Sequence, residues 1–269
     1  MHIHRPAPDV TALSDNTEIP GLGFLPINAY VVHAAEPVLI DTGQPISRTE
    51  FLDALWSAVD PVDLRWIYLT HPDRDHTGAL AEVLAAAPQA RLVTTFLGFG
   101  ITSIDFPVTP DRAYFLNPGQ ALDVGDRLLT AFRPPVYDSP ATTGLYDEST
   151  GTCFSSDCFG APFGSASDTE VGDIGELSPD AVEAGQRLWT TVDSPWVAGV
   201  DRTQFAASLA PLGAMNPQVV LSTHLPPARN AMPRLLETLA STPDADVFVG
   251  PDQAMLEAML ASMHAPMPA

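Results

Sequence analysis

The residues best suited to chemistry lie in one short polar segment, Thr70–Gly78, which reads THPDRDHTG. Four side chains of types that bind metal ions, His71, Asp73, Asp75 and His76, fall within six consecutive residues. In an extended stretch residues i and i+2 face the same side, so His71 and Asp73 can converge on one ion. A turn after them directs Asp75 and His76 to another. The segment therefore predicts two adjacent metal positions.

Two further ligand-type side chains follow apolar segments later in the chain. Asp157 comes just after residues 152–155, and His224 comes just after residues 219–222. Both segments are predicted strands, and a strand end holds a side chain rigidly enough to serve as a ligand. We therefore expect Asp157 and His224 to join the polar segment at one site.

The apolar patterns around these residues alternate between strands and helices, which is typical of an α/β domain. Two short strands are expected at 28–33 and 38–41, and a strand at 65–70 leads into the polar loop and a helix that Thr77 caps. Further strands are expected at 91–95, 128–132, 143–146, 152–155 and 219–222. Further helices are expected at 47–59, 179–190, 203–212, 232–240 and 252–263. The stretches 98–111 and 160–176 are predicted as loops that shape a substrate pocket.

Length and composition indicate one globular domain over residues 1–269, ending in a docking helix at about 251–264. The formal charge of −21, from 33 acidic and 12 basic residues, excludes nucleic acid and anionic membrane surfaces as partners. The sequence contains no apolar run of membrane-spanning length and no apolar signal core at its start. Together with only two cysteines, Cys153 and Cys158, this predicts a cytoplasmic protein.

The order of the motifs resembles that of the metallo-β-lactamase superfamily, which has an Asp-Thr-Gly strand end, a His-x-His-x-Asp-His loop, a bridging Asp and a final His. Here the corresponding motifs are Asp41-Thr42-Gly43, the loop 71–76, Asp157 and His224, and the resemblance spans about residues 24–228. It implies an α/β fold of the αββα type, a sandwich of two mixed β-sheets flanked by helices.

One departure from the hydrolase pattern narrows the resemblance. Asp73 stands where the usual second histidine would be, and the flavodiiron branch, which contains oxygen-binding diiron proteins, carries a carboxylate there too. The Ser-Asp-x-Phe-Gly sequence around Asp157 is also similar to that branch. The resemblance further implies that Asp41 supports the ligand loop from behind by hydrogen bonding. It implies a first metal position of His71 and Asp73, a second of Asp75, His76 and His224, and a bridging Asp157.

The first position lacks a third terminal ligand, because no histidine occurs from residue 77 to residue 223. The corresponding segment offers Arg133, Tyr137 and Asp138 instead. Either Tyr137, Asp138 or water completes a weak site, or Arg133 places its guanidinium near Asp73 and offsets the negative charge. Tyr137 is also a candidate catalytic acid, because a phenol beside a cation can donate a proton to a bound species.

Three functions are compatible with these residues. The first is a flavodiiron-like non-haem iron protein that binds or reduces dioxygen or nitric oxide and uses an external electron donor, because the chain leaves no room for a flavodoxin domain. The second is a metal-dependent hydrolase, in which the cation lowers the pKa of water from about 15.7 towards 7 and Asp75 positions that water against an ester, lactone or thioester. The third is a degenerate metal-binding scaffold. The local motifs favour the first function, and an enzyme over a scaffold.

The donor set also bears on the metal. Mixed histidine and carboxylate ligands suit iron or manganese better than a site of three histidines does, although zinc usually binds more tightly. We expect one or two divalent ions, with iron favoured and zinc or manganese as alternatives. The expected partners are a small-molecule substrate or a diatomic gas, and the sequence is compatible with a homodimer.

Overall fold

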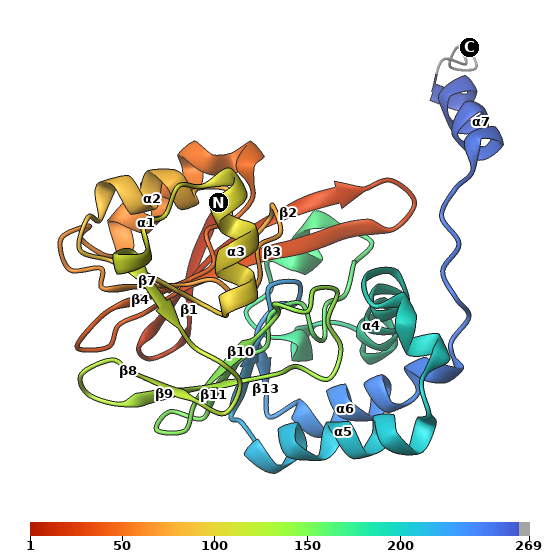
Figure 1. The fold of residues 1–269 in the computed structure, drawn as a ribbon. Helices are drawn as coiled ribbons and strands as arrows, with labels where there is room; N and C mark the ends of the chain where they lie inside the picture. The colour runs from red at the N-terminus through yellow and green to blue at the C-terminus, as the bar shows by residue number, and fades with distance from the viewer. Residues whose placement is uncertain (264–269) are drawn as a thin grey trace.

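Two β-sheets pack face to face, and helices cover both outer faces (Figure 1). The computed structural model describes residues 1–263. Among these residues the first sheet runs in chain order: β1 His2–Ala7, β2 Val10–Ile19, β3 Gly23–Val32, β4 Val38–Ile40, β5 Trp66–Tyr68, β6 Arg91–Thr94 and β7 Ala113–Phe115. The second sheet has the order β13 Ala228–Arg229, β12 Val219–Leu221, β11 Thr152–Phe154, β10 Gly144–Asp147, β9 Leu128–Phe132 and β8 Ala121–Asp123. Both sheets mix parallel and antiparallel pairs, which confirms the predicted αββα sandwich.

Five of the seven helices described within residues 1–263 form two separate layers. The described helices are α1 Arg48–Ala58, α2 Leu80–Ala86, α3 Phe96–Asp105, α4 Pro179–Asp193, α5 Arg202–Met215, α6 Met232–Ala240 and α7 Gln253–Met263. Side chains of α1 and α2 pack on the outer face of the first sheet. Side chains of α4, α5 and α6 pack on the outer face of the second sheet.

The apolar core follows from side-chain alternation along strands that are buried on both faces. In β4, Val38 and Ile40 face the space between the sheets, whereas Leu39 packs under the helices of the first layer. In β11, Phe154 faces the same inter-sheet space and Cys153 faces the opposite helix layer. Burying a side chain of this size stabilises the fold by roughly 1.5–3 kcal/mol. Such strands read as short continuous apolar runs in the sequence, as parallel strands usually do.

The ends of four strands meet at one edge of the sandwich. Strands β4 and β5 are parallel in the first sheet, and β11 and β12 are parallel in the second. The sheets are tied together at this edge by the hydroxyl of Tyr30, which donates to the Ser222 carbonyl at 2.7 Å. A second tie is the hydroxyl of Tyr68, which donates to Thr143 Oγ1 at 2.6 Å. The loops that carry the candidate ligands therefore emerge side by side.

Two local predictions are wrong. The helix expected from Thr77 begins at Leu80, because the Thr77 hydroxyl donates to the Asp73 carbonyl at 2.9 Å inside the loop and does not cap a helix. The stretch expected as a loop at 98–111 contains most of α3, whose first turn is capped by Thr95 Oγ1 accepting from the Gly98 amide at 3.0 Å. Glycines at 98 and 100 hide this helix from a sequence pattern, because glycine lowers helix propensity.

The C-terminal helix is present as α7, but the side chains of its residues 253–261 are exposed and it lies away from the layers (Figure 1). The docking expected for this helix stays a prediction, and residue 264, where it was expected to end, lies outside the described residues. Across residues 1–263, no helix combines the length and apolar character that crossing a bilayer requires.

Gly78 sits at the closest approach between the ligand loop and the segment after β4. Its amide donates to the Gly43 carbonyl at 2.7 Å, and an added Cβ would lie 2.3 Å from the Gln44 carbonyl carbon. We expect Gly78→Ala to lower the free energy of unfolding by about 1–3 kcal/mol, measured by chemical denaturation. The added methyl group would clash with the backbone of residues 43–45, which would have to move. Gly100→Ala is the matched control, since its Cβ would meet open space in α3. Equal stability of the two variants would contradict this interpretation.

Candidate metal centre

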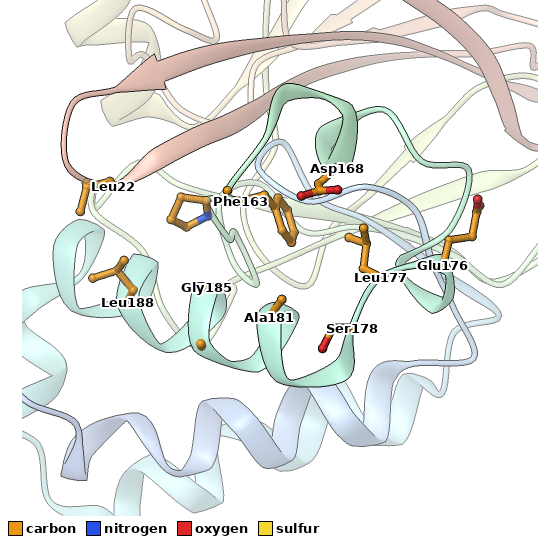
Figure 2. Close-up of a pocket in the computed structure, with 12 residues that line it drawn as sticks. Leu22, Phe163, Asp168, Glu176, Leu177, Ser178, Ala181, Gly185 and Leu188 are labelled. Carbon is orange, nitrogen blue, oxygen red and sulfur yellow. The ribbon is translucent and has the colours of Figure 1, made fainter. Parts of the chain in front are cut away.

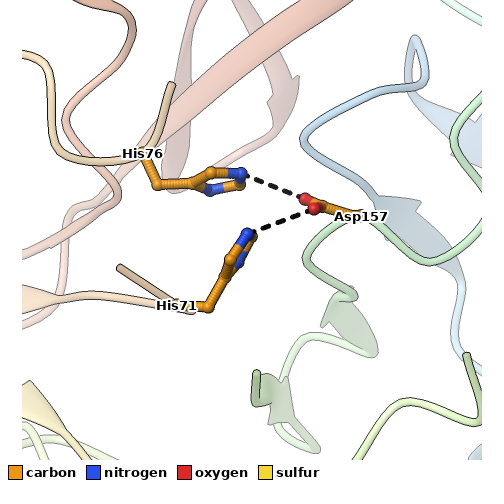
Figure 3. Close-up of side chains that lie close together, drawn as sticks. All are labelled: His71, His76 and Asp157. Carbon is orange, nitrogen blue, oxygen red and sulfur yellow. Dashed lines mark ion pairs between the residues drawn. The ribbon is translucent and has the colours of Figure 1, made fainter. Parts of the chain in front are cut away.

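Asp157, which follows β11, lies between three imidazoles from both sheets. Its Oδ2 is 3.3 Å from His71 Nε2, and its Oδ1 is 3.1 Å from His76 Nε2 (Figure 3). Oδ1 also lies 3.4 Å from His224 Nε2. All four side chains are buried, with at most 4% of each exposed. The two oxygens of one carboxylate therefore face two different sets of donors.

The residues predicted for the second metal position lie on the Oδ1 side of Asp157. Asp75 Oδ2 lies 3.6 Å from His76 Nε2 and 3.4 Å from His224 Nε2. Asp75, His76 and His224 each offer a ligand atom, and these atoms all lie within 4.8 Å of one another. The structure thus brings together every residue predicted for this position.

The residues predicted for the first metal position lie on the Oδ2 side of Asp157, around His71. Asp73 Oδ1 is 4.0 Å from His71 Nε2, and Asp138 Oδ1 is nearer, at 3.7 Å. His71, Asp73 and Asp138 form a second cluster of ligand atoms within 4.8 Å of one another. Of the residues considered for the missing place, Asp138 is the one that the fold brings to His71.

Asp41 holds the ligand loop from behind, as the resemblance implies. Its Oδ2 accepts from His76 Nδ1 at 2.8 Å, and its two oxygens accept from the amide and the hydroxyl of Thr70, both at 2.8 Å. A carboxylate only accepts, so Nδ1 of His76 carries the proton and Nε2 is left to face the centre. The neighbouring Thr42 donates its amide and its hydroxyl to the His76 carbonyl.

His224 is held by the first sheet, although it follows a strand of the second. Its Nδ1 donates to the Pro26 carbonyl at 2.8 Å, which again leaves Nε2 for the centre. Asn28 fixes the same turn, because its side-chain amide donates to the carbonyls of Ser222 and Leu225 at 3.1 and 2.9 Å. Sequence reasoning missed Asn28, and its signal was one amide inside an otherwise apolar strand.

Three residues around the candidate ligands have a positive backbone φ, which residues other than glycine rarely adopt. Asp41 has a φ of +58°, and Ser156 and Phe159, which flank Asp157, have φ values of +55° and +74°. Each such residue costs about 1–3 kcal/mol and persists only where the surroundings hold it. Strain of this kind concentrates at functional sites, and here it directs Asp157 towards the imidazoles.

The electrostatics of the cluster reflect buried charge. Burial alone would lower the pKa of His76, but the carboxylates of Asp157, Asp75 and Asp41 raise it well above its ordinary value. Burial would raise the pKa of Asp157, but the three imidazoles hold it far below the usual range. A metal ion can take the place of the Nε2 proton in such a pair, because ligands bind in their deprotonated form.

Asp193, at the end of α4, is a further carboxylate beside the cluster. Burial, followed by the charges of Asp157 and Asp138, raises its pKa to about 8, so it holds a proton at neutral pH. Sequence reasoning missed this residue too. It lies three residues beyond the helix predicted at 179–190, which the structure extends to Asp193, and the helix dipole disfavours negative charge in such a last turn.

The residues present fit a pair of metal ions. Nε2 of His71, Nε2 of His76 and Oδ1 of Asp157 are buried and have no hydrogen-bond partner of good geometry, although buried polar atoms are almost always satisfied. All three atoms point into the same space (Figure 3). Imidazole nitrogens and carboxylate oxygens are ligands for iron, manganese and zinc, so this space suits such cations.

Arg133 and Tyr137 contact each other, whereas the sequence suggested Arg133 near Asp73 or Tyr137 as a metal ligand. Arg133 donates to the Thr142 carbonyl, and its guanidinium carbon is 5.1 Å from the centre of the Tyr137 ring. Within residues 1–263, Arg133 forms no ion pair with Asp73, because its hydrogen bond to the Thr142 carbonyl holds the guanidinium elsewhere. The Tyr137 ring packs on Trp196 at 5.3 Å and lines an open cavity of about 670 Å³. The catalytic role of Tyr137 stays a prediction.

The stretch expected to shape a substrate pocket at 160–176 does line a cavity, of about 460 Å³, against α4 (Figure 2). Phe163, Leu177 and Leu188 form its apolar wall, and Asp168 and Glu176 lie at its polar side (Figure 2). None of the candidate metal ligands lines this cavity. It is therefore separate from the metal centre.

Comparison with known proteins places these features in a family. The sequence pattern of the metallo-beta-lactamase superfamily matches residues 22–169. A putative diflavin flavoprotein A 1 from Thermosynechococcus vestitus is 30% identical over 142 residues, which are 51% of this chain and 24% of that protein. The anaerobic nitric oxide reductase flavorubredoxin of Salmonella typhi is 31% identical over 136 residues, 49% of this chain and 28% of that protein.

Solved structures show the same fold. The rubredoxin oxygen:oxidoreductase of Desulfovibrio gigas superposes with a TM-score of 0.76 at 17% identity, over 89% of this chain and 61% of that one. The flavodiiron protein of Giardia intestinalis superposes with a TM-score of 0.76 at 17% identity, over 90% of this chain and 59% of that one, so the structural neighbours include the branch that the motifs resemble. The chain spans about a quarter of the length of the curated relatives that it matches.

Asp41 offers a test of the support behind the centre. We expect Asp41→Asn to weaken metal binding about 10–100-fold, because an amide cannot accept from His76 Nδ1 and Thr70 together as the carboxylate does. Asparagine tolerates the positive φ, so the backbone is kept. Calorimetric titration with Zn²⁺ measures the loss, with Asp15→Asn as the control, since Asp15 binds Gln44 and Ser47 and no candidate ligand. Equal affinity of Asp41→Asn and the unaltered protein would refute the supporting role.

Proposed function

Since the chain belongs to the metallo-β-lactamase superfamily, we propose that it is a non-haem iron protein whose paired metal centre binds or reduces dioxygen or nitric oxide. The observation that carries the proposal is the placement of the Asp157 carboxylate. Its two oxygens face two different clusters of potential metal ligands. A shared carboxylate of this kind suits two neighbouring cations. The carboxylate Asp73 in the ligand loop distinguishes this chain from the histidine pattern of the hydrolases.

The ligands proposed for the centre come from both sheets. His71 and Asp73 would hold the first ion, Asp75, His76 and His224 would hold the second, and Asp157 would bridge them. Bound iron would supply the electrons that a diatomic gas accepts, and an external donor would restore them. Relatives whose names describe nitric oxide reduction and oxygen reduction support this reaction class.

The protein's own residues orient the donors and control access. Asp41 and the Pro26 carbonyl keep protons on Nδ1 of His76 and His224, so that both Nε2 atoms face the centre. The side chains of His71 and His76 are fully buried, whereas those of Asp73 and Asp75 are 52% and 32% exposed. A small gas would therefore reach the centre from the side of the ligand loop, and bulk water would be excluded from the imidazoles.

The two cysteines bear on the compartment. Cys153 and Cys158 are buried and unpaired, and burial raises the pKa of both thiols. Neither belongs to the donor clusters, and Cys158 packs in the apolar core on the helix side of the second sheet. Free thiols fit a reducing compartment, so we place the proposed reaction in the cytoplasm.

Iron content and the response to nitric oxide test the function. We expect protein loaded anaerobically with Fe²⁺ to hold about two irons per chain and to develop a nitrosyl absorption band when nitric oxide is added, as non-haem iron does. His224→Ala should lose at least half of the iron and of the band. His33→Ala is the matched control, because His33 binds Thr11 away from the centre.

Two outcomes would contradict the proposal. One is a fully iron-loaded protein without a nitrosyl band. The other is a protein that retains only zinc, which is redox-inactive, and cleaves small esters, lactones or thioesters. The second outcome would establish the hydrolase alternative in its place.

A further inference from the structure

We propose that Asp138 is the third terminal ligand of the first metal position, and that this position consequently selects a harder cation, Mn²⁺ or Fe²⁺, than the second. The inference rests on the metal centre of the proposed function, but not on the gas that reacts there. It accounts for the absence of any histidine between residues 77 and 223.

The geometry brings Asp138 to an unsatisfied ligand atom. Its Oδ1 lies 3.7 Å from Nε2 of His71, a fully buried atom without a hydrogen-bond partner of good geometry. Asp73 shares this cluster, with all three ligand atoms within 4.8 Å of one another. The Asp157 oxygen that faces His71 supplies a fourth donor. One imidazole and three carboxylates therefore surround the first position.

The fold delivers Asp138 to this place through the backbone. The loop after β9 is tied to the ligand loop where the amide of Thr143 donates to the Thr70 carbonyl at 2.9 Å. The hydroxyl of the preceding residue, Thr142, donates to Asp138 Oδ1 at 3.3 Å and orients the carboxylate. The carbonyl of Thr142 accepts from Arg133 and keeps that guanidinium out of the cluster.

The charge around the first position calls for a cation. Asp138 and Asp157 place carboxylate oxygens within 4.8 Å of each other, and within residues 1–263 no arginine pairs with either of them. The four proposed ligand carboxylates, Asp73, Asp75, Asp138 and Asp157, balance the four positive charges of two divalent ions. A metal at the first position would relieve the repulsion.

The two positions then differ in donor chemistry. The first has one nitrogen, from His71, and three carboxylates. The second has two nitrogens, from His76 and His224, and two carboxylates, from Asp75 and the shared Asp157. Carboxylate oxygens suit manganese and imidazole nitrogens suit zinc, so replacing an imidazole by Asp138 shifts the first position towards the harder ion.

Titration of metal-free protein with Mn²⁺ alone tests the ligand role, with free Mn²⁺ followed by electron paramagnetic resonance. The unaltered chain should bind about two ions. Asp138→Asn should weaken one of them at least about 10-fold, since even residues behind the ligands change affinity by that much. Asp193→Asn is the matched control, because it replaces a neighbouring acidic side chain that does not belong to the His71 group of ligand atoms. It should keep both ions.

A second variant tests selectivity and guards against misfolding. Asp138→His should still bind two ions, and in competition with equimolar Zn²⁺ and Mn²⁺ it should raise the zinc-to-manganese ratio of the bound metal at least about twofold. Retention of the second ion by Asp138→Asn reports that the fold is intact. Unchanged Mn²⁺ binding by Asp138→Asn, equal losses in Asp138→Asn and Asp193→Asn, or an unchanged metal ratio in Asp138→His would each overturn the inference.

The two proposals fail separately. A chain that binds two Mn²⁺ ions with the expected dependence on Asp138, yet shows no nitrosyl band when loaded with iron, keeps this inference and loses the proposed function. A chain that forms the nitrosyl band while Asp138→Asn binds Mn²⁺ normally keeps the function and loses the inference.

Discussion

The structure depends on one buried carboxylate that three imidazoles must share. Asp157 offers its Oδ1 to His76 and His224 and its Oδ2 to His71, at distances of 3.1–3.4 Å. Removing such a charge from water costs several kcal/mol unless partners surround it closely. Since the imidazoles come from loops of both sheets, the sheets must meet at this edge with little freedom.

The scaffold meets that requirement with ties that have no chemical role of their own. Asn28 and Tyr30 bind the turn before His224 across the sheets, and Asp41 with Thr42 fixes the loop that carries His71 and His76. Strained residues at 41, 156 and 159 turn the chain so that the carboxylates face inward. The apolar core between the two sheets, together with the cores under the two helix layers, stabilises the fold enough to offset this strain.

The centre is asymmetric, and that asymmetry links the fold to its proposed chemistry. One side of Asp157 is enclosed by imidazoles held by hydrogen bonds on their far nitrogens. The other side collects carboxylates around a single imidazole, with a proton-bearing Asp193 behind them. Hard oxygen donors and charge balance favour iron or manganese there. The flavodiiron proteins to which the chain is similar share the sandwich, at identities that establish the fold.

The sequence by itself determined the ligand loop and its order relative to Asp157 and His224, because placement at strand ends is a local pattern. The sandwich followed from the resemblance of these motifs to the metallo-β-lactamase superfamily. The sequence did not determine α3, since two glycines mask a helix that Thr95 caps and tertiary packing stabilises. Nor could it choose between Arg133, Tyr137 and Asp138 for the incomplete position. Only the tertiary structure shows which of them lies near His71, because the Thr143–Thr70 tie holds the loop that places Asp138 Oδ1 3.7 Å from His71 Nε2, and the Thr142 carbonyl draws Arg133 away. Contacts between residues far apart in the chain leave no periodic signal in it.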